Sequence, residues 1–336
     1  MTSTSQCGIA LSDCYTPRYA TLVHVEMETN IVANLIPLIL DVDTGIDDAL
    51  AIELAVRRPD ADLIAVTTLA GNTDVTNTTE NSRRVLGLLN ASSVPVYQGA
   101  SRPLARARRD ATHYHGANGV GDARLPRPSA PLVPERGPAA IIRMVRERPG
   151  EIVLVATGPL TNLAIALNVF PQLPSMLKRL VIMGGAYRRP GNSTPHAEFN
   201  ILADPDAAQQ VFGASFPEAI AVGLDVTCQT VLTKSSWEQA SREPSPVTQL
   251  LTAVCRRSFV DLGQGDFQLH DPLTTAVALD PSLITSERGR IDVTLDGEEE
   301  GRTVLTPSSD GSWNVALAVD AERFVTGFLA SYGLTA

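Results

Sequence analysis

The segment LIPLILDVDTGIDDALAIELAVRR, residues 35–58, indicates the fold class. It begins with a short apolar run that ends in polar residues, as expected of a strand buried in a parallel sheet. Gly45 permits a tight turn. An apolar stretch with two basic residues at its end follows, and its length and composition predict a buried helix.

The same alternation continues outward along the chain. Further strands are expected at residues 61–72, 94–99, 151–159, 178–185 and 219–227, with helices at 79–91, 139–148, 160–170 and 204–212. Six strands separated by helical crossovers predict an α/β fold with a doubly wound, mainly parallel, Rossmann-like sheet flanked by helices. Short strands at 290–295 and 313–319 are expected to add a small antiparallel edge near the C-terminus, before a last helix at 321–332.

Two kinds of segment interrupt this pattern. The irregular stretches at about 100–134 and 186–197 are long for a compact α/β domain, and such loops usually form lids or binding loops. Residues 1 to about 33 do not fit the pattern and lack the features of a secretory signal. We interpret residues 1–33 as a loosely ordered extension, or as residues upstream of a true start at Met27, and residues 34–336 as a single domain.

Composition excludes several classes of function. The formal net charge of -10 argues against a protein that binds nucleic acid polymers, because phosphate contacts require a basic surface. No apolar run reaches the roughly 20 residues that span a bilayer, so no membrane association is expected. Cys7, Cys14, Cys228 and Cys255 form no C-x-x-C pair, which favours reduced thiols and a cytoplasmic location.

The densest chemical signal is the acidic cluster of Asp41, Asp43, Asp47 and Asp48. It lies at the carboxyl end of the first strand, where open parallel sheets place their ligand sites. One acid here could simply cap the helix and interact with its dipole. Four clustered acids repel one another unless a cation lies among them. Since no His or Cys stands at ligand spacing, the residues predict an all-oxygen site for calcium or magnesium.

Other polar groups follow later strands. They are Asn72 after "LAG", Thr157 in "TGPLTN", Glu198 and Asn200 in "EFN", and the pair His270 and Asp271 before "PLTTA". Each has a structural alternative: Asp271 before proline and Thr161 are common helix starts, and the others could serve loop hydrogen bonding. The glycines of "HYHGANGVGD", residues 113–122, suggest a mobile flap.

Taken together, these segments closely resemble the inosine–uridine-preferring nucleoside hydrolases. The ordered set is "DVDTGIDDALAI", "LAGN", "HYHGANGVGD", "TGPLTNLA", "VIMGGA", "AEFNILADPDAA" and "HDPLTTA". The resemblance covers about residues 36–332. It implies an enzyme that hydrolyses the N-glycosidic bond of ribonucleosides to ribose and a free purine or pyrimidine base, a Ca²⁺ cofactor, and a homodimer or homotetramer.

The resemblance also assigns roles to residues. By it, Asp43, Asp48, Asp271 and the backbone carbonyl of Thr157 bind calcium, and Asp43 takes the proton from a calcium-bound water. Asp41 supports the cluster from behind. The residues that the resemblance places around the substrate are Asp47, Asn72, His115, Met183, Asn192, Glu198 and Asn200.

The mechanism that these roles imply does not identify the residue that donates a proton to the departing base. Cleavage builds positive charge on the ribose, which a carboxylate-rich pocket stabilises. No carboxylic acid is reserved for the departing base. We expect His270 to donate to it, since an ordinary histidine pKa near 6.5 permits donation around neutral pH. A neutral histidine hydrogen-bonded beside Asp271 is the structural alternative.

The preferred base is not indicated by the sequence. The stretch before the His270–Asp271 pair carries Phe259 and Phe267 where pyrimidine-preferring members often carry tyrosines, and neither Trp237 nor Trp313 lies in a matched motif.

Two other functions are alternatives to a nucleoside hydrolase. A phosphatase of the haloacid dehalogenase type is a rival, but Gly45 stands where its motif needs Thr or Val. A calcium-dependent nucleoside-binding protein without turnover is the non-enzymatic alternative, against which the presence of a base at Asp43 argues.

Overall fold

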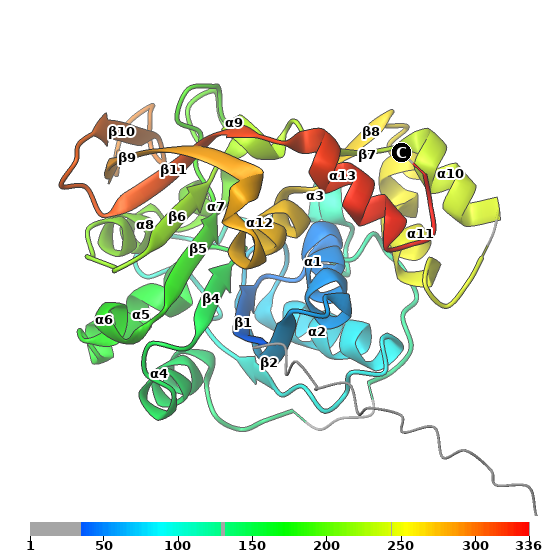
Figure 1. Ribbon diagram of the computed structural model, residues 1–336, viewed down its shortest axis with the longest axis horizontal. Helices are drawn as coiled ribbons and strands as arrows, with labels where there is room; N and C mark the ends of the chain where they lie inside the picture. The colour runs from blue at the N-terminus through cyan, green and yellow to red at the C-terminus, as the bar shows by residue number, and fades with distance from the viewer. Residues whose placement is uncertain (1–34, 129–131, 243, 336) are drawn as a thin grey trace, which may run out of the picture. The chain divides into compact units, whose positions relative to one another are not determined.

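The computed structural model describes residues 35–128, 132–242 and 244–335. The expectation for residues 1–33 lies outside these. A nine-stranded sheet runs through the described part in the order β10-β9-β11-β6-β5-β4-β1-β2-β3 (Figure 1). Its strands are β1 (Ile36–Val42), β2 (Ala61–Thr68), β3 (Val96–Gln98), β4 (Val153–Ala156), β5 (Arg179–Met183), β6 (Ala219–Val222), β9 (Ile284–Val293), β10 (Thr303–Pro307) and β11 (Trp313–Val319).

The sheet confirms the predicted fold class. Strands β1 to β6 pair only in parallel, and β11 extends this parallel part beside β6. Strands β9 and β10 then form the antiparallel edge that the late strands predicted. The central strand β1 is almost wholly buried between β2 and β4, as its continuous apolar run requires.

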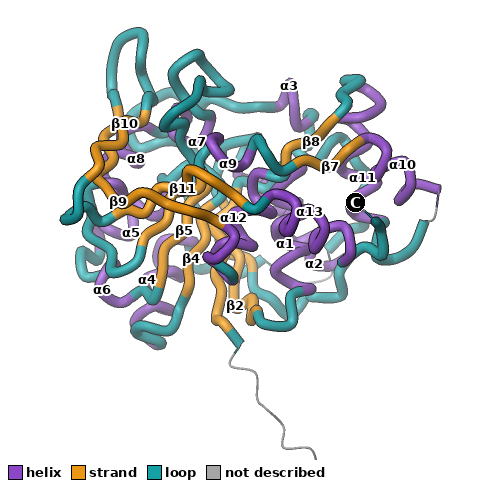
Figure 2. The backbone as a smooth tube through the Cα atoms, turned by 45° about the horizontal axis from the view of Figure 1, so that its top comes forward, coloured by secondary structure: helices purple, strands orange, loops and turns teal. Residues whose placement is uncertain are grey.

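Helices cover both faces of the sheet (Figures 1 and 2). Leu38, Leu40 and Val42 of β1 belong to the core on one face, and Ile39 belongs to the core on the other. The first core includes residues of α1 (Ile46–Arg57), α2 (Val75–Leu88), α11 (Gln249–Arg256), α12 (His270–Leu279) and α13 (Ala321–Ala330). The second includes residues of α4 (Gly137–Glu147), α5 (Thr161–Val169), α6 (Leu173–Met176) and α8 (Pro205–Phe212).

The remaining elements are short. They are α3 (Thr112–His115), α7 (Phe199–Ala203), α9 (Leu224–Thr227), β7 (Val231–Thr233), α10 (Lys234–Arg242), a π-helical turn η1 (Arg257–Asp261), β8 (Asp266–Gln268) and the 3-10 turn η2 (Pro281–Leu283). Strands β7 and β8 form a separate antiparallel pair. No helix in the described part of the chain is both long and apolar enough to cross a membrane.

Several predicted boundaries differ from the structure by a few residues, and two of these differences have a clear local cause. The strand expected at 219–227 ends at Val222, and α9 begins two residues later. The cause is Gly223, after which the Leu224 amide donates to the Gly185 carbonyl across the sheet edge (2.9 Å) and the chain turns into a helix. The helix expected at 79–91 begins earlier, at Val75, because Asp74 caps it by accepting from the amides of Thr76 and Asn77.

Candidate active site

The first strand ends in two buried aspartates that face different partners. Asp41 Oδ1 accepts from Thr67 Oγ1 (2.6 Å) and from Asn162 Nδ2 (2.7 Å), while its Oδ2 has no protein partner in the described part of the chain. Burial raises the pKa of Asp41 to about 6, although these two hydrogen bonds lower it. Asp41 is therefore held between β2 and α5, beneath the acids that follow it.

Asp43 is enclosed by backbone. Its Oδ2 accepts from the Asn72 amide (2.7 Å). A methyl group added at Gly71 would lie 2.0 Å from that same oxygen, and one at Gly158 would lie 2.9 Å from the other carboxylate oxygen. Burial, followed by repulsion from Asp48, raises the pKa of Asp43 well above its usual range. These two glycines leave the Asp43 carboxylate little freedom to move.

Asp47 and Asp48 occupy the first turn of α1. Asp48 Oδ2 accepts from the Gly45 amide (2.8 Å) and from Asn72 Nδ2 (3.2 Å), and its Oδ1 accepts from Thr157 Oγ1 (2.8 Å). Asp48 thus does cap the helix, as the structural alternative expected, and it lies in the acid cluster as well. Burial and the charge of Asp48 raise the pKa of Asp47 to about 8.

Asp271 adds a further acid to this cluster from α12, which packs beside α1. Ligand oxygens of Asp47, Asp48 and Asp271 all lie within 4.8 Å of one another, and all three residues are buried. Burial, with repulsion from Asp47, Asp48 and Asp43, raises the pKa of Asp271 well above its usual range. No lysine or arginine in the described ranges lies within ion-pair distance of these acids. Convergent buried oxygen donors without a counter-charge fit a hard divalent cation.

The predicted metal ligands are brought together only in part. Asp48 and Asp271 belong to the convergent group, and Asp43 lies close enough to affect the pKa of Asp271. Asp47, which the resemblance places at the ribose, belongs to the group as well. The Thr157 carbonyl accepts a hydrogen bond from Asn200 Nδ2 (2.7 Å).

A second polar group begins helix α7. Glu198 caps this helix: Oε1 accepts from the Asn200 amide (2.8 Å), and Oε2 accepts from the amides of Ile201 (3.2 Å) and Gly185 (3.1 Å). Asn200 Nδ2 also donates to the carbonyl of Met183 (3.2 Å). The loop hydrogen bonding that the sequence allowed is therefore present, and it fixes these side chains beside Thr157.

Of the two histidines predicted at the site, His115 is buried and His270 is half-buried, and both are neutral. The Ile46 amide donates to Nδ1 of His115 (3.1 Å), which places the proton of this imidazole on Nε2. Burial lowers the pKa of His115 to about 3. His270 Nδ1 lies 2.7 Å from Thr227 Oγ1, and burial lowers the pKa of His270 to about 4, with a smaller effect from Arg189. The argument from an ordinary histidine pKa near 6.5 therefore does not hold for His270.

A cavity of about 330 Å³ opens above the acids, within the size range of small-molecule sites. Every predicted site residue except Asp43 and Asp48, which lie beneath it, lines this cavity. Residues that sequence reasoning missed as site residues are Ala111, Tyr114, Ser193, Phe199, Cys228 and Gln268. Tyr114, Phe199 and Gln268 lie within or next to the quoted motifs, and this proximity is the signal that could have identified them.

The aromatic residues considered for base preference lie in different surroundings. Phe267 lines the cavity and stacks on Tyr114, with ring centroids 6.5 Å apart. Phe259 instead belongs to the core and packs against Trp237 (5.4 Å). Trp313 packs in the other core against Phe212 (4.9 Å). Neither tryptophan lines the cavity, and neither lies in a matched motif.

Known proteins with similar sequences and structures are nucleoside hydrolases. The family model described as "Inosine-uridine preferring nucleoside hydrolase" matches residues 38–326. A protein of that name from Leishmania major is 37% identical over 80% of this chain and 87% of its own length. The pyrimidine-specific ribonucleoside hydrolase RihA of Salmonella arizonae is 38% identical over 86% of this chain and 96% of its own.

Solved structures agree with these matches. A plant nucleoside hydrolase, the PpNRh1 enzyme, superimposes with a TM-score of 0.83 at 32% identity, covering 88% of this chain and 98% of that one. A purine-preferring ribonucleoside hydrolase from Gardnerella vaginalis gives 0.82 at 33% identity, with the same coverage. The sequence match, the sheet order and the cavity above buried acids all lead to one conclusion: the chain belongs to the inosine-uridine preferring nucleoside hydrolase family, enzymes that hydrolyse N-glycosyl compounds.

Proposed function

We propose that this protein hydrolyses the N-glycosidic bond of ribonucleosides, releasing ribose and a free purine or pyrimidine base. The observation that carries the proposal is the convergence of Asp47, Asp48 and Asp271 at the cavity, which Asp47 and Asp271 line; all three are buried and have no cationic side chain beside them in the described ranges. Cleavage of the bond builds positive charge on the ribose ring, and fixed carboxylates in a water-poor site stabilise such charge.

The oxygen donors also support a bound Ca²⁺. Asp43, Asp48, Asp271 and the carbonyl of Thr157 would hold the ion, with Asp47 adjacent in the same carboxylate group. When bound, calcium supplies Lewis acidity that lowers the pKa of a coordinated water. Its charge would also relieve the mutual repulsion that raises the pKa values of these acids.

Asp43 is the proposed general base. Its carboxylate is fixed by the Asn72 amide at Oδ2 and confined by Gly71 and Gly158, so it can accept a proton from the attacking water without reorganising. Asp43 is not among the residues that line the cavity, and Asp47 and Asp271 beside it are. Proton transfer to a side chain held in this way commonly contributes about 10²–10⁴-fold to rate.

Ribose binding is assigned to Asp47, Asn72, Asn192, Glu198 and Asn200, with Met183 as an apolar contact. The contacts of Glu198 with three backbone amides and of Asn200 with two carbonyls hold these side chains in place before a substrate arrives. Orientation of this kind removes part of the entropic barrier to reaction.

Contact with the departing base is assigned to His270 and His115, which both line the cavity. Both imidazoles are neutral at pH 7, because burial lowers their pKa values to about 4 and about 3. They therefore act as N–H hydrogen-bond donors to the leaving base rather than as imidazolium acids. For His115 the donor is Nε2–H, since its Nδ1 already accepts from the Ile46 amide.

The cellular location and the oligomeric state of the enzyme are also proposed. We propose a cytoplasmic homodimer or homotetramer, consistent with the free thiols of Cys228 and Cys255. Light scattering of the purified full chain measures the assembly, and a monomeric mass at micromolar concentration would contradict this part.

The test of the reaction is an assay of reducing sugar. The protein is incubated with inosine, uridine, cytidine and adenosine, each with calcium and with chelator, and free ribose is measured. We expect calcium-dependent release that falls at least about 100-fold in Asp43→Ala. The ranking of the four substrates gives the base preference. Substrate binding without ribose release, in protein that holds calcium, would instead support a nucleoside-binding protein.

A further inference from the structure

The short helix α3 forms one wall of the cavity. Its residues His113, Tyr114 and His115 line the cavity, as does Ala111 before it. A helix of four residues is too short to be stable by itself. It is followed by Gly116, Gly119 and Gly121, all at positive φ, which form a tight loop. The position of this wall therefore depends on what other parts of the molecule hold it.

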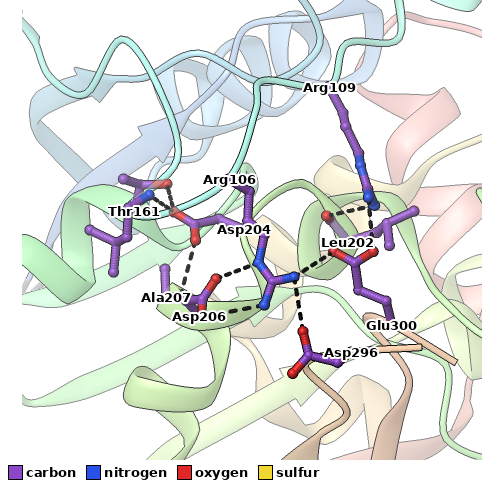
Figure 3. Close-up of polar contacts among 10 residues, drawn as sticks. Arg106, Arg109, Thr161, Leu202, Asp204, Asp206, Ala207, Asp296 and Glu300 are labelled. Carbon is purple, nitrogen blue, oxygen red and sulfur yellow. Dashed lines mark hydrogen bonds and ion pairs between the residues drawn. The ribbon is translucent and has the colours of Figure 1, made fainter.

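The chain is well anchored before it enters α3 (Figure 3). Arg106 forms ion pairs with Asp206 (2.7 Å) and Glu300 (3.2 Å), and Arg109 pairs with Glu300 (2.9 Å). The Leu104 amide donates to Asp204 Oδ2 (2.9 Å). These contacts fix residues 104–109 against α8 and the turn between β9 and β10, but they do not reach α3.

Arg257, from the π-helical turn η1, holds α3 itself. Its Nε donates to the Tyr114 carbonyl (2.9 Å), its Nη2 to the His113 carbonyl (3.0 Å), and its Nη1 to Asp122 Oδ2 (3.1 Å). In the described ranges, no other side chain donates to either carbonyl. The guanidinium fork is a rigid plane, so three simultaneous bonds define the position of the loop as well as its attachment.

The two segments that Arg257 joins also pack closely. A methyl group at Gly121 would lie 2.3 Å from the Val254 carbonyl of α11, so the loop after α3 lies directly on the helix that leads into η1. Tyr114 stacks on Phe267 and its hydroxyl lies 3.4 Å from Gln264 Oε1. The wall formed by α3 is thus joined to the segment 254–267, which carries none of the site's acids, and it also contacts the start of α1 where the Ile46 amide donates to His115 Nδ1 (3.1 Å).

We infer that Arg257 is a positioning residue: it fixes the α3 turn that carries His115 over the cavity and thereby sets the affinity for substrate. The inference rests on the proposed function. Asp43 follows β1, Asp47 and Asp48 begin α1, and Asp271 begins α12, and none of these contacts Arg257. Loss of Arg257 should therefore weaken substrate binding and leave the chemistry at the acids in place.

The experiment compares Arg257→Met and Arg257→Lys with Arg256→Gln. Arg256 is the preceding residue, is more than half exposed, and pairs among the described residues only with Asp261, so it is the matched control. For the nucleoside that wild type cleaves best, Arg257→Met should raise KM about tenfold, the equivalent of about 1.4 kcal/mol, with kcat within about threefold. Arg257→Lys should recover part of this loss, because an ammonium can satisfy one carbonyl without the fork.

A second measurement does not depend on catalysis. Hydrogen exchange of the peptide covering residues 111–122, in calcium-loaded protein without nucleoside, should accelerate in Arg257→Met and match wild type in Arg256→Gln. The His115 and Gly121 amides, which donate to the carbonyls of Ala111 and His115, report this directly. Unchanged exchange, or a fall in kcat with unchanged KM, overturns the inference. If wild type cleaves no nucleoside, yet exchange in residues 111–122 is faster in Arg257→Met than in wild type, the proposed function is refuted and the structural role of Arg257 stands.

Discussion

Helix α1 buries acidic side chains near both of its ends, in different surroundings. Near its C-terminal end, Glu53 Oε1 lies 2.7 Å from Arg57 Nη2, and its Oε2 accepts from the Tyr332 hydroxyl (2.6 Å). At its N-terminal end, Asp47 and Asp48 meet further carboxylates and no cationic side chain in the described ranges. The first arrangement is a buried acid with its partners supplied by the protein. The second has no such partner among the described residues, and the cation that we propose would balance its charge.

The difference separates a structural acid from a functional one on the same helix. Backbone amides and hydroxyls satisfy part of the hydrogen bonding of Asp48, yet its charge still raises the pKa values of Asp43, Asp47 and Asp271. Such repulsion costs folding free energy, and a ligand that removes it returns that energy as binding affinity. The helix N-terminus supplies a partial positive charge, which is too small to neutralise four carboxylates.

The largest expected effect comes from removing charge at the N-terminal end. Asp48→Asn keeps an oxygen for the Gly45 amide and can place its NH₂ toward Thr157 Oγ1, so the fold is retained. We expect kcat/KM to fall roughly 100-fold or more, as for loss of a metal ligand, while the calcium-free protein becomes more stable. Steady-state kinetics and calcium-free thermal unfolding measure the two effects.

Glu53→Gln is the matched control for that variant. It removes one buried carboxylate from the same helix and should leave kcat/KM within about twofold, because Glu53 does not line the cavity. If the two variants reduced activity equally, the functional distinction between the two ends of α1 would be lost.

The sequence predicted the two ends of α1 unequally well. The acidic cluster was readable because "DVDTGIDD" follows an apolar run, and the topology of a parallel sheet brings the later strand ends to the same edge. Asp271 was noticed only as another strand-to-helix junction, and its place among these acids came from the resemblance; it begins α12, which follows β8 of the separate antiparallel pair, so the topology of the parallel sheet alone does not predict its position. By contrast, nothing around Glu53 indicates that Tyr332, near the C-terminus, donates to it.

The site elements that sequence reasoning missed have a common physical cause. Strands β7 and β8 are three residues each and pair across the intervening helices, so no local periodicity marks them. The contacts of Arg257 go to backbone carbonyls of a distant turn, and such contacts impose no pattern on side chains. The lowered pKa of His270 comes chiefly from burial, which depends on packing that a sequence motif does not specify.

A smaller effect is expected from calcium itself. At a free calcium concentration about 100 times its Kd, binding to the folded state alone should stabilise the wild type by about 2.7 kcal/mol. Asp271→Asn should lose most of this stabilisation, because it removes a member of the convergent group, and Glu53→Gln should keep all of it. Thermal unfolding with calcium and with chelator measures the shift. Equal stabilisation of all three proteins would place the ion elsewhere.

The smallest effect concerns pH and the C-terminal end of α1. Burial raises the pKa of Glu53 to about 7 from an ordinary value of 4.5, despite the opposing effects of Tyr332 and Arg57. The folded protein therefore holds this proton more tightly than the unfolded chain does. The contribution of Glu53 to stability is most favourable below pH 4.5 and declines as the pH rises toward 7.

Glu53→Gln should remove that pH dependence. Relative to wild type, the variant should gain roughly 1–3 kcal/mol of unfolding free energy between pH 5 and pH 8, whatever its absolute stability at either pH. Urea unfolding in chelator at the two pH values measures the gain and keeps the calcium site out of the comparison. A gain near zero would mean that Arg57 and Tyr332 fully offset the cost of burying the Glu53 carboxylate. The difference between a partnered acid at one end of α1 and unpartnered acids at the other would then be larger than the raised pKa of Glu53 indicates.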